Sequence, residues 1–170
     1  MRGRDLERYR REIGWRDAPP LDTAVEPPAE EPPAAPGDLE SLAREAASCT
    51  RCRLADQRRN VVVGEGDPHA LVMFIGEGPG AEEDRTGRPF VGQAGMLLDA
   101  MIFSLGLERR QAYIANVVKC RPPGNRDPEA DEVAACAPFL DRQIALIRPQ
   151  VIVALGKPAA RRLTGSTAPI

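Results

Sequence analysis

Three short apolar runs alternate with longer stretches in which apolar residues recur at helical spacing. The runs are Leu71 to Ile75 (LVMFI), Ala112 to Val118 (AYIANVV) and Val151 to Leu155 (VIVAL). Their length and β-branched content predict strands buried inside a parallel sheet. The order strand, helix, strand, helix, strand predicts an α/β fold with a doubly wound parallel sheet, in which ligands bind at the carboxyl ends of the strands.

The helical stretches have recognisable starts. Asp38 is a candidate N-cap for a helix in which Leu39, Leu42 and Ala46 share one face. Asp127 and Pro128 predict the start of another helix, and Pro138 predicts a break or kink within it. Between the first two strands, Gln93 to Leu105 predicts a helix with five apolar residues on one stripe. These are Leu97, Leu98, Met101, Ile102 and Leu105.

Composition limits the chain to one ordered domain. With 170 residues, of which 42% are hydrophobic and 4% aromatic, it fills a single aliphatic core. Residues 17–37 hold seven prolines and five acids. We therefore expect residues 1–37 to form a disordered Pro/acid-rich extension, either dispensable or a docking arm for an unknown partner, and residues 38–170 to form the domain.

Charge and hydropathy exclude several classes of protein. The formal net charge of −2 gives no overall basic character, so contact with nucleic acid would depend on a local patch. No apolar run approaches the roughly 18 residues of a membrane span, and the charged start MRGRDLERYRREIGW is unlike a signal peptide. We expect a cytoplasmic monomer without membrane contact.

The four cysteines are spaced like metal ligands. Cys49 and Cys52 lie at a helix end, Cys120 follows a strand, and Cys136 lies on a predicted helix. In a reducing cytosol such thiols bind metal or stay buried more often than they form disulfides. The spacing alone leaves structural zinc, a [4Fe-4S] cluster and inert thiols open.

Cations surround these cysteines in the sequence. They would offset thiolate charge and favour a nearby phosphate backbone, or else they form an ordinary solvated face. They are Arg51, Arg53, Arg58, Arg59, Lys119 and Arg121.

The stretch GEGPGAEEDRTGRPFVG directly follows the first predicted strand. It lacks the P-loop pattern and the third glycine of a dinucleotide fingerprint, and its acids would repel a pyrophosphate. Its glycines predict tight turns and close backbone approach, and Glu77 stands at the strand tip where a catalytic group belongs. Phe90 lies on a loop, where it could stack on a flat ring or serve as a core residue.

Amide side chains follow the second predicted strand. Asn116 offers both a donor and an acceptor, which suits the edge of a base. Asn125 and Arg126 follow in the rigid segment KCRPPGNRDP. A ring, a carboxylate, amides and cations at one rim predict a nucleobase pocket.

These motifs together resemble a known family. GEGPGAEEDRTGRPFVGQAG, YIANVVKCRPPGNRDP and IRPQVIVALG, with four cysteines at these spacings, are similar to the family 4 uracil-DNA glycosylases of iron-sulfur type, from about Cys49 to Leu163. The resemblance implies a doubly wound fold with four parallel core strands, three of which this sequence supplies. It also implies excision of uracil from DNA in base excision repair.

The resemblance implies roles for individual residues. The [4Fe-4S] cluster would be held by Cys49, Cys52, Cys120 and Cys136. Glu77 and Gly78 would belong to the first catalytic motif, with Glu77 acting on the attacking water, while Asn125 belongs to a loop near the pocket and is a second catalytic candidate. Three further side chains would contact the base: Glu83 beside C5, Phe90 on its face and Asn116 at its edge.

The same family carries a later HPSP-type histidine motif and a fourth strand, which this sequence lacks. Its one histidine, His69, is predicted to lie in a turn. We therefore expect feeble or absent glycosylase activity from the 170-residue chain, together with an exposed sheet edge. The alternatives are a catalytically impaired DNA-binding iron-sulfur module and an electron carrier.

Overall fold

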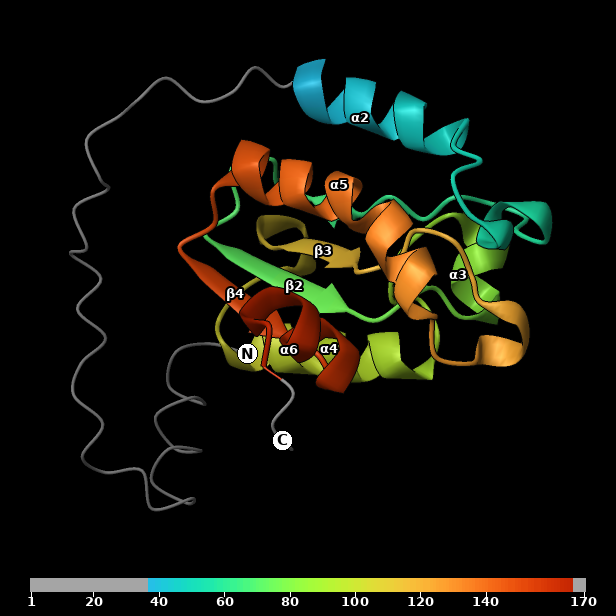
Figure 1. Cartoon of the computed structure of the whole chain (residues 1–170). Coiled ribbons are helices and arrows are strands. Elements are labelled where there is room, and N and C mark those ends of the chain that lie inside the picture. The colour runs from blue at the N-terminus through green and yellow to red at the C-terminus, as the bar shows by residue number, and fades with distance from the viewer. Residues whose placement is uncertain (1–36, 167–170) are drawn as a thin grey trace. The chain divides into compact units, whose positions relative to one another are not determined.

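The computed structural model describes residues 37–166 (Figure 1). All the elements below belong to one compact unit, Pro33–Ile170. The predicted extension, residues 1–37, lies outside the described residues except for Gly37. The prediction of a partner for this extension therefore lies outside them too.

A four-stranded mixed sheet forms the centre of this unit. Its strands are β1 (Glu65–Gly66), β2 (Val72–Gly76), β3 (Tyr113–Asn116) and β4 (Val151–Ala154), in the order β1-β3-β2-β4. The strands β2, β3 and β4 are parallel, which confirms the three predicted strands, while β1 pairs with β3 in the antiparallel direction. The sequence did not predict β1, because two residues carry no periodicity.

Helices cover both faces of the sheet, as a doubly wound fold requires. Figure 1 shows α2 and α5 over one face and α4 over the other. Within residues 37–166, no helix is both long and apolar enough to cross a lipid bilayer. The α-helices of the described chain are α2 (Gly37–Ala47), α3 (Ala81–Thr86), α4 (Gln93–Ser104), α5 (Ala130–Ile147) and α6 (Lys157–Thr164), and the short 3₁₀ helices are η1 (Arg53–Asp56), η2 (Arg109–Gln111) and η3 (Pro123–Asn125).

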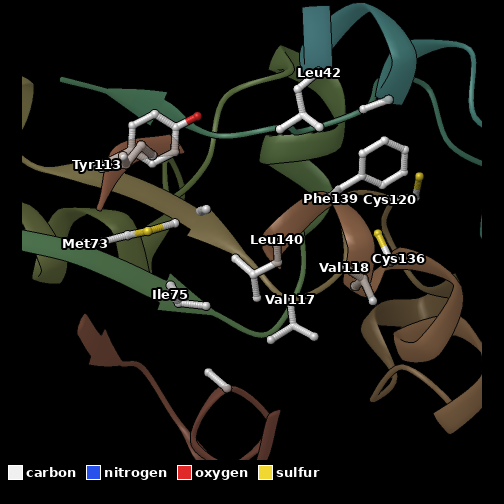
Figure 2. Close-up of a cluster of buried hydrophobic side chains, with 14 of the residues drawn as sticks. Leu42, Met73, Ile75, Tyr113, Val117, Val118, Cys120, Cys136, Phe139 and Leu140 are labelled. Carbon is white, nitrogen blue, oxygen red and sulfur yellow. The ribbon is translucent and has the colours of Figure 1, made fainter. Parts of the chain in front are cut away.

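The core follows the alternation of the strands. Met73 and Ile75 of β2 face the larger cluster, which includes Leu42 of α2 and Phe139 of α5 (Figure 2), whereas Phe74 faces the smaller cluster under α4. The predicted face of α2 is confirmed, because Leu42 and Ala46 are buried and Leu39 packs against them. The predicted N-cap was wrong, because the helix begins at Gly37 and Asp38 therefore lies inside its first turn.

The predicted apolar stripe of α4 is only half correct. Leu98 and Ile102 are buried against the sheet, but the side chains of Leu97, Met101 and Leu105 are largely exposed. One helix packed on a sheet buries a narrow face, and the predicted stripe was too wide to fit under it. The periodicity therefore located the helix correctly and overestimated its contact.

The predicted start of α5 was wrong, because the helix begins at Ala130 after Glu129 and not at Asp127. Of the predicted break or kink at Pro138, the break is wrong, because the helix continues through this residue. An interior proline costs about 3 kcal/mol. Residues on both sides of Pro138 pack into the core, among them Cys136, Phe139 and Leu140, and this packing offsets the lost hydrogen bond.

The strand β4 lies at the edge of the described sheet. It pairs with β2 alone, and Val151 and Ile152 are exposed. The prediction of a buried strand was therefore wrong for this run, while the prediction of an exposed sheet edge is confirmed.

Candidate functional site

A pocket of about 290 Å³ opens at the carboxyl ends of β2 and β3. It brings together all six site residues that the sequence predicted outside the cysteines. These are Glu77, Gly78, Glu83, Phe90, Asn116 and Asn125, and the further lining residues are Pro79, Gly80, Ala94, Pro122, Arg126 and Asp127. We call residues 88–92 the Phe90 wall and residues 122–127 the Asn125 wall.

The strand register brings the Phe90 ring and the Asn116 amide to the same strand end. Gly76 at the end of β2 pairs with Asn116 at the end of β3. A Cβ atom on Gly76 would lie 2.4 Å from the ring of Phe90 and 2.6 Å from Oδ1 of Asn116. Only glycine leaves room for this ring and this amide to approach the same strand end.

Asn116 carries a buried polar atom without a partner. Its side chain is 1% exposed, and its Oδ1 accepts no hydrogen bond within the described part of the protein. Nearly all buried polar atoms are paired, since an unpaired one costs about 1–3 kcal/mol. An acceptor in this state beside an aromatic ring is suited to an N–H group of a flat ligand.

Phe90 is held in a strained backbone conformation. Its φ is +49°, a region that bulky residues rarely adopt. A Cβ atom on Gly95 of α4 would lie 2.0 Å from the carbonyl oxygen of Phe90, so the helix start packs directly on this backbone. Arg109 donates to the carbonyl oxygen of Pro89 at 2.6 Å and pairs with Glu65 of β1. The ring lines the pocket and also packs against the smaller core cluster, which confirms the predicted core contact and leaves stacking on a flat ring as a prediction.

The glycines at the end of β2 and after it leave room for neighbouring side chains. None of Gly76, Gly78 and Gly80 is among the residues with positive φ. Each instead leaves space for a side chain: a Cβ atom would lie 2.8 Å from Val118 Cγ2 at Gly78 and 2.7 Å from Glu83 Oε2 at Gly80. Close approach explains them, whereas unusual dihedral angles do not.

Glu83 connects the Phe90 wall to the loop after β2. Its carboxylate accepts hydrogen bonds from the backbone N–H groups of Val91 and Gly92 at 2.9 Å each, and from Gly80 at 3.1 Å. Burial acts to raise the pKa of Glu83, but these backbone hydrogen bonds outweigh it and the net shift is downward. Glu83 therefore lines the pocket as predicted, with both oxygens engaged by the protein.

The neighbouring acids have structural partners too. Glu82 pairs with Arg85, and the buried Asp84 accepts from the backbone N–H groups of Arg59 and Asn60. This acidic run fastens α3 to the segment after η1.

Glu77 shares the pocket with a second carboxylate that the sequence analysis did not single out. Burial, followed by the negative charge of Asp127, raises the pKa of Glu77. A carboxylate with a raised pKa is a candidate proton acceptor. The sequence indicated Asp127 only as part of a predicted helix start, and gave no sign that its carboxylate lies in the pocket.

The Asn125 wall is fixed by arginines. Asn125 has a φ of +57°, and its Oδ1 accepts from Arg121 Nε at 2.7 Å. Arg126 donates twice to the buried Glu132, at 2.7 and 2.8 Å. The pKa of Glu132 falls to about 2, chiefly through the hydrogen bond from Arg126.

The four cysteines converge as the sequence predicted. All four line one small cavity, to which α2, α5 and the segment after β3 contribute. Figure 2 shows Cys120 and Cys136 beside Phe139. All four thiols are free of disulfide bonds. Among residues 37–166, no three His, Cys, Asp or Glu side chains stand in the arrangement that holds a single metal ion.

Two of the four thiols in this cavity are hard to ionise. Burial raises the pKa of Cys136 to about 11 and also raises the pKa of Cys120, and neighbouring cysteines add to both shifts. Arg58 donates to Sγ of Cys120 at 3.3 Å, and the backbone N–H of Lys119 donates to Sγ of Cys136 at 3.3 Å. The donor set fits a group that is positively charged and accepts thiolates.

Several of the surrounding cations have partners within the protein. Arg51 pairs with Glu45 and lies over the ring of Phe139, and Lys119 is buried with its Nζ on the carbonyl oxygen of Asn116 and on Gln143. His69 lies in the predicted turn, where its N–H donates to Asp67.

The comparisons with known proteins match this site. Residues 63–168 match the model of the uracil DNA glycosylase superfamily. The chain is 59% identical over 120 residues to a type-4 uracil-DNA glycosylase of Sulfurisphaera tokodaii, covering 70% of this chain and 54% of that protein. A type-4 enzyme of Thermotoga maritima is 54% identical over 121 residues, covering 71% and 63%.

A more distant relative is the type-5 uracil-DNA glycosylase of Pyrobaculum aerophilum, 39% identical over 120 residues, or 60% of this chain and 53% of that protein. The chain thus spans about half to two thirds of the length of these curated relatives. The family match covers more than half of the chain and includes every pocket residue. This chain therefore belongs to the uracil DNA glycosylase superfamily.

Proposed function

We propose that the protein recognises uracil turned out of DNA and hydrolyses its N-glycosidic bond. The unpaired Oδ1 of buried Asn116, beside the Phe90 ring, carries this proposal. Uracil presents an N–H next to a carbonyl, so one asparagine amide can accept from the first and donate to the second. The relatives named type-4 uracil-DNA glycosylases support the choice of base.

The chemistry assigns different tasks to the pocket residues. Turning the nucleotide out of the duplex costs a few kcal/mol, which a mismatched uracil lowers. Phe90 stacks on the base, and Asn116 binds its edge. Bond cleavage leaves positive charge on the sugar and negative charge on the base. The carboxylate of Glu77 either accepts a proton from the attacking water or stabilises the positive charge on the sugar.

Asn116→Ala tests this proposal. We expect the variant to lose at least about 100-fold in kcat/KM for release of uracil from a uracil-containing oligonucleotide. Binding of free uracil is measured on the same samples by equilibrium dialysis. Unchanged release by the variant contradicts the role of Asn116. Binding of uracil by the wild-type chain without release retains recognition and refutes hydrolysis by this chain.

We further propose that Cys49, Cys52, Cys120 and Cys136 hold a [4Fe-4S] cluster, which when bound joins α2, α5 and the segment after β3. The shared cavity and the thiol and cation set described above support a thiolate-bound group, and the resemblance favours a cluster over zinc. Iron and acid-labile sulfide are measured on anaerobically purified protein, with Cys136→Ser as the comparison. Stoichiometric zinc without iron would contradict the proposal.

A further inference from the structure

We propose that Glu132 is a positioning residue that couples the Cys49–Cys52 loop to the Asn125 wall of the pocket. The enzymatic part of this inference rests on the proposed function, whereas its structural part does not. The coupling acts through two arginines, Arg53 and Arg126, that bind the same buried carboxylate.

The contacts come from three separate segments. Arg53, the residue after Cys52, donates from Nε to Glu132 Oε1 at 2.9 Å. Arg126, in the Asn125 wall, donates from Nη2 to Oε1 at 2.7 Å and from Nη1 to Oε2 at 2.8 Å. The backbone N–H of Glu129 donates to Oε2 at 2.8 Å.

The Glu132 carboxylate is fully hydrogen-bonded within the protein. The Glu132 side chain is 0% exposed, and its two oxygens accept four hydrogen bonds, about the number of lone pairs that they offer. Removing one cationic partner from a buried ion pair leaves charge uncompensated and is strongly unfavourable. If either arginine moved away, the buried Glu132 carboxylate would lose hydrogen bonds that nothing replaces. The two segments that carry the arginines therefore keep a fixed spacing.

Each arginine sits where its position matters. Arg53 opens η1 between Cys52 and the buried Leu54, so it follows the cysteine loop. Arg126 lies between Asn125 and Asp127, and all three line the pocket. Arg126 also donates to the carbonyl oxygen of Asp127 at 2.9 Å, which fixes the turn of the wall.

Arg53→Met tests the coupling, because Arg53 does not line the pocket. The readout is hydrogen exchange at the amides of Asn125 and Arg126, which donate to Pro122 and Pro123 within the wall. We expect their exchange to rise by at least about fivefold in Arg53→Met and in Glu132→Gln. We expect kcat/KM for uracil release to fall about tenfold in both variants.

The matched control is Asp131→Asn. Asp131 is exposed and also contacts Arg53, at 3.3 Å, but it does not line the pocket. We expect this variant to leave the exchange of both amides and the release of uracil at wild-type values. Arg53→Lys, which keeps the charge, should recover part of the loss.

The outcomes separate the alternatives. Faster exchange at the wall in Glu132→Gln but not in Arg53→Met would overturn the coupling and leave Glu132 as a local partner of Arg126. Equal changes in Asp131→Asn would also overturn it, as would a general rise across β2 and β3. If the wild-type chain releases no uracil, the proposed function fails, and the exchange measurements still decide the coupling.

Discussion

The two walls of the pocket are both anchored by a glutamate, but the anchors differ in what they connect. Glu83 supports the Phe90 wall by binding three backbone N–H groups that lie within nine residues of it. Glu132 supports the Asn125 wall by binding two arginines, of which Arg53 lies 79 residues from it along the chain and Arg126 lies 6 residues from it. The first glutamate acts within its own part of the chain, and the second connects its wall to a distant segment.

This difference separates two kinds of dependence. The Phe90 wall depends on its own loop, on α4 and on the contact of Arg109 with Pro89, and it makes no contact with the cysteine loop through Glu83, because the nearby backbone supplies every donor to Glu83. The Asn125 wall depends in addition on the cysteine loop that carries Arg53. Variants that act on one wall and spare the other therefore test whether the pocket is one unit or two.

The largest effect is expected from Gly76→Ala, which acts between the walls. The added methyl would lie 2.4 Å from the ring of Phe90 and 2.6 Å from Oδ1 of Asn116, so both groups must shift. A displacement of this kind lowers catalysis by about 100-fold, and we expect that loss in kcat/KM for uracil release. Wild-type release by Gly76→Ala would show that the ring and the amide do not jointly hold the base.

Overpacking alone also destabilises a protein, by about 1–3 kcal/mol, so a second variant is needed. In Gly76→Ala combined with Phe90→Leu, the smaller side chain relieves the overlap with the ring but not the overlap with Oδ1 of Asn116. We expect this double variant to recover part of the melting temperature but not the activity, because it lacks the stacking ring. Recovery of both would mean that the single variant acted through stability.

An intermediate effect is expected from Glu83→Gln, which acts on the Phe90 wall alone. The amide keeps one acceptor but directs an NH₂ group at backbone donors, so the strained backbone at Phe90 loses part of its support. We expect kcat/KM to fall about tenfold, with faster hydrogen exchange at Val91 and Gly92. The amides of Asn125 and Arg126 serve as the internal control. If they change as well, the two walls are not independent.

The sequence predicted the pocket well for a physical reason. Glu77 and Asn116 lie at the ends of β2 and β3, and parallel strands bring their carboxyl ends to one edge. The convergence of these two residues follows from the strand order, whereas Phe90 reaches the pocket from the loop between α3 and α4. The resemblance to a known family added Gly78, Glu83 and Asn125, and the pocket contains these as well.

The features that were missed depend on tertiary contacts without a local pattern. Nothing in the sequence pairs Arg53 with Glu132, and a buried glutamate in the first turn of α5 resembles any acidic helix start. The width of the α4 contact and the continuity of α5 through Pro138 depend on packing around the helix. The close approach predicted for Gly76, Gly78 and Gly80 is confirmed, but the sequence did not show that side chains of the same chain are what approach them.

The smallest effect is expected from Asp127→Asn, which changes the charge of the Asn125 wall and keeps its shape. Burial and then Asp127 raise the pKa of Glu77. Loss of the Asp127 charge should lower that pKa toward its ordinary value. If Glu77 acts as a carboxylate, it is active above its pKa, so the acid limb of the pH profile of kcat/KM should move to lower pH by less than about one unit. The shift should shrink at high salt, because Asp127 is exposed.

The control is Asp131→Asn, which removes the same charge from a residue that does not line the pocket. This variant should leave the acid limb in place. Movement of the alkaline limb instead would assign Glu77 the role of a proton donor, and equal shifts in both variants would assign the effect to the overall charge of this region.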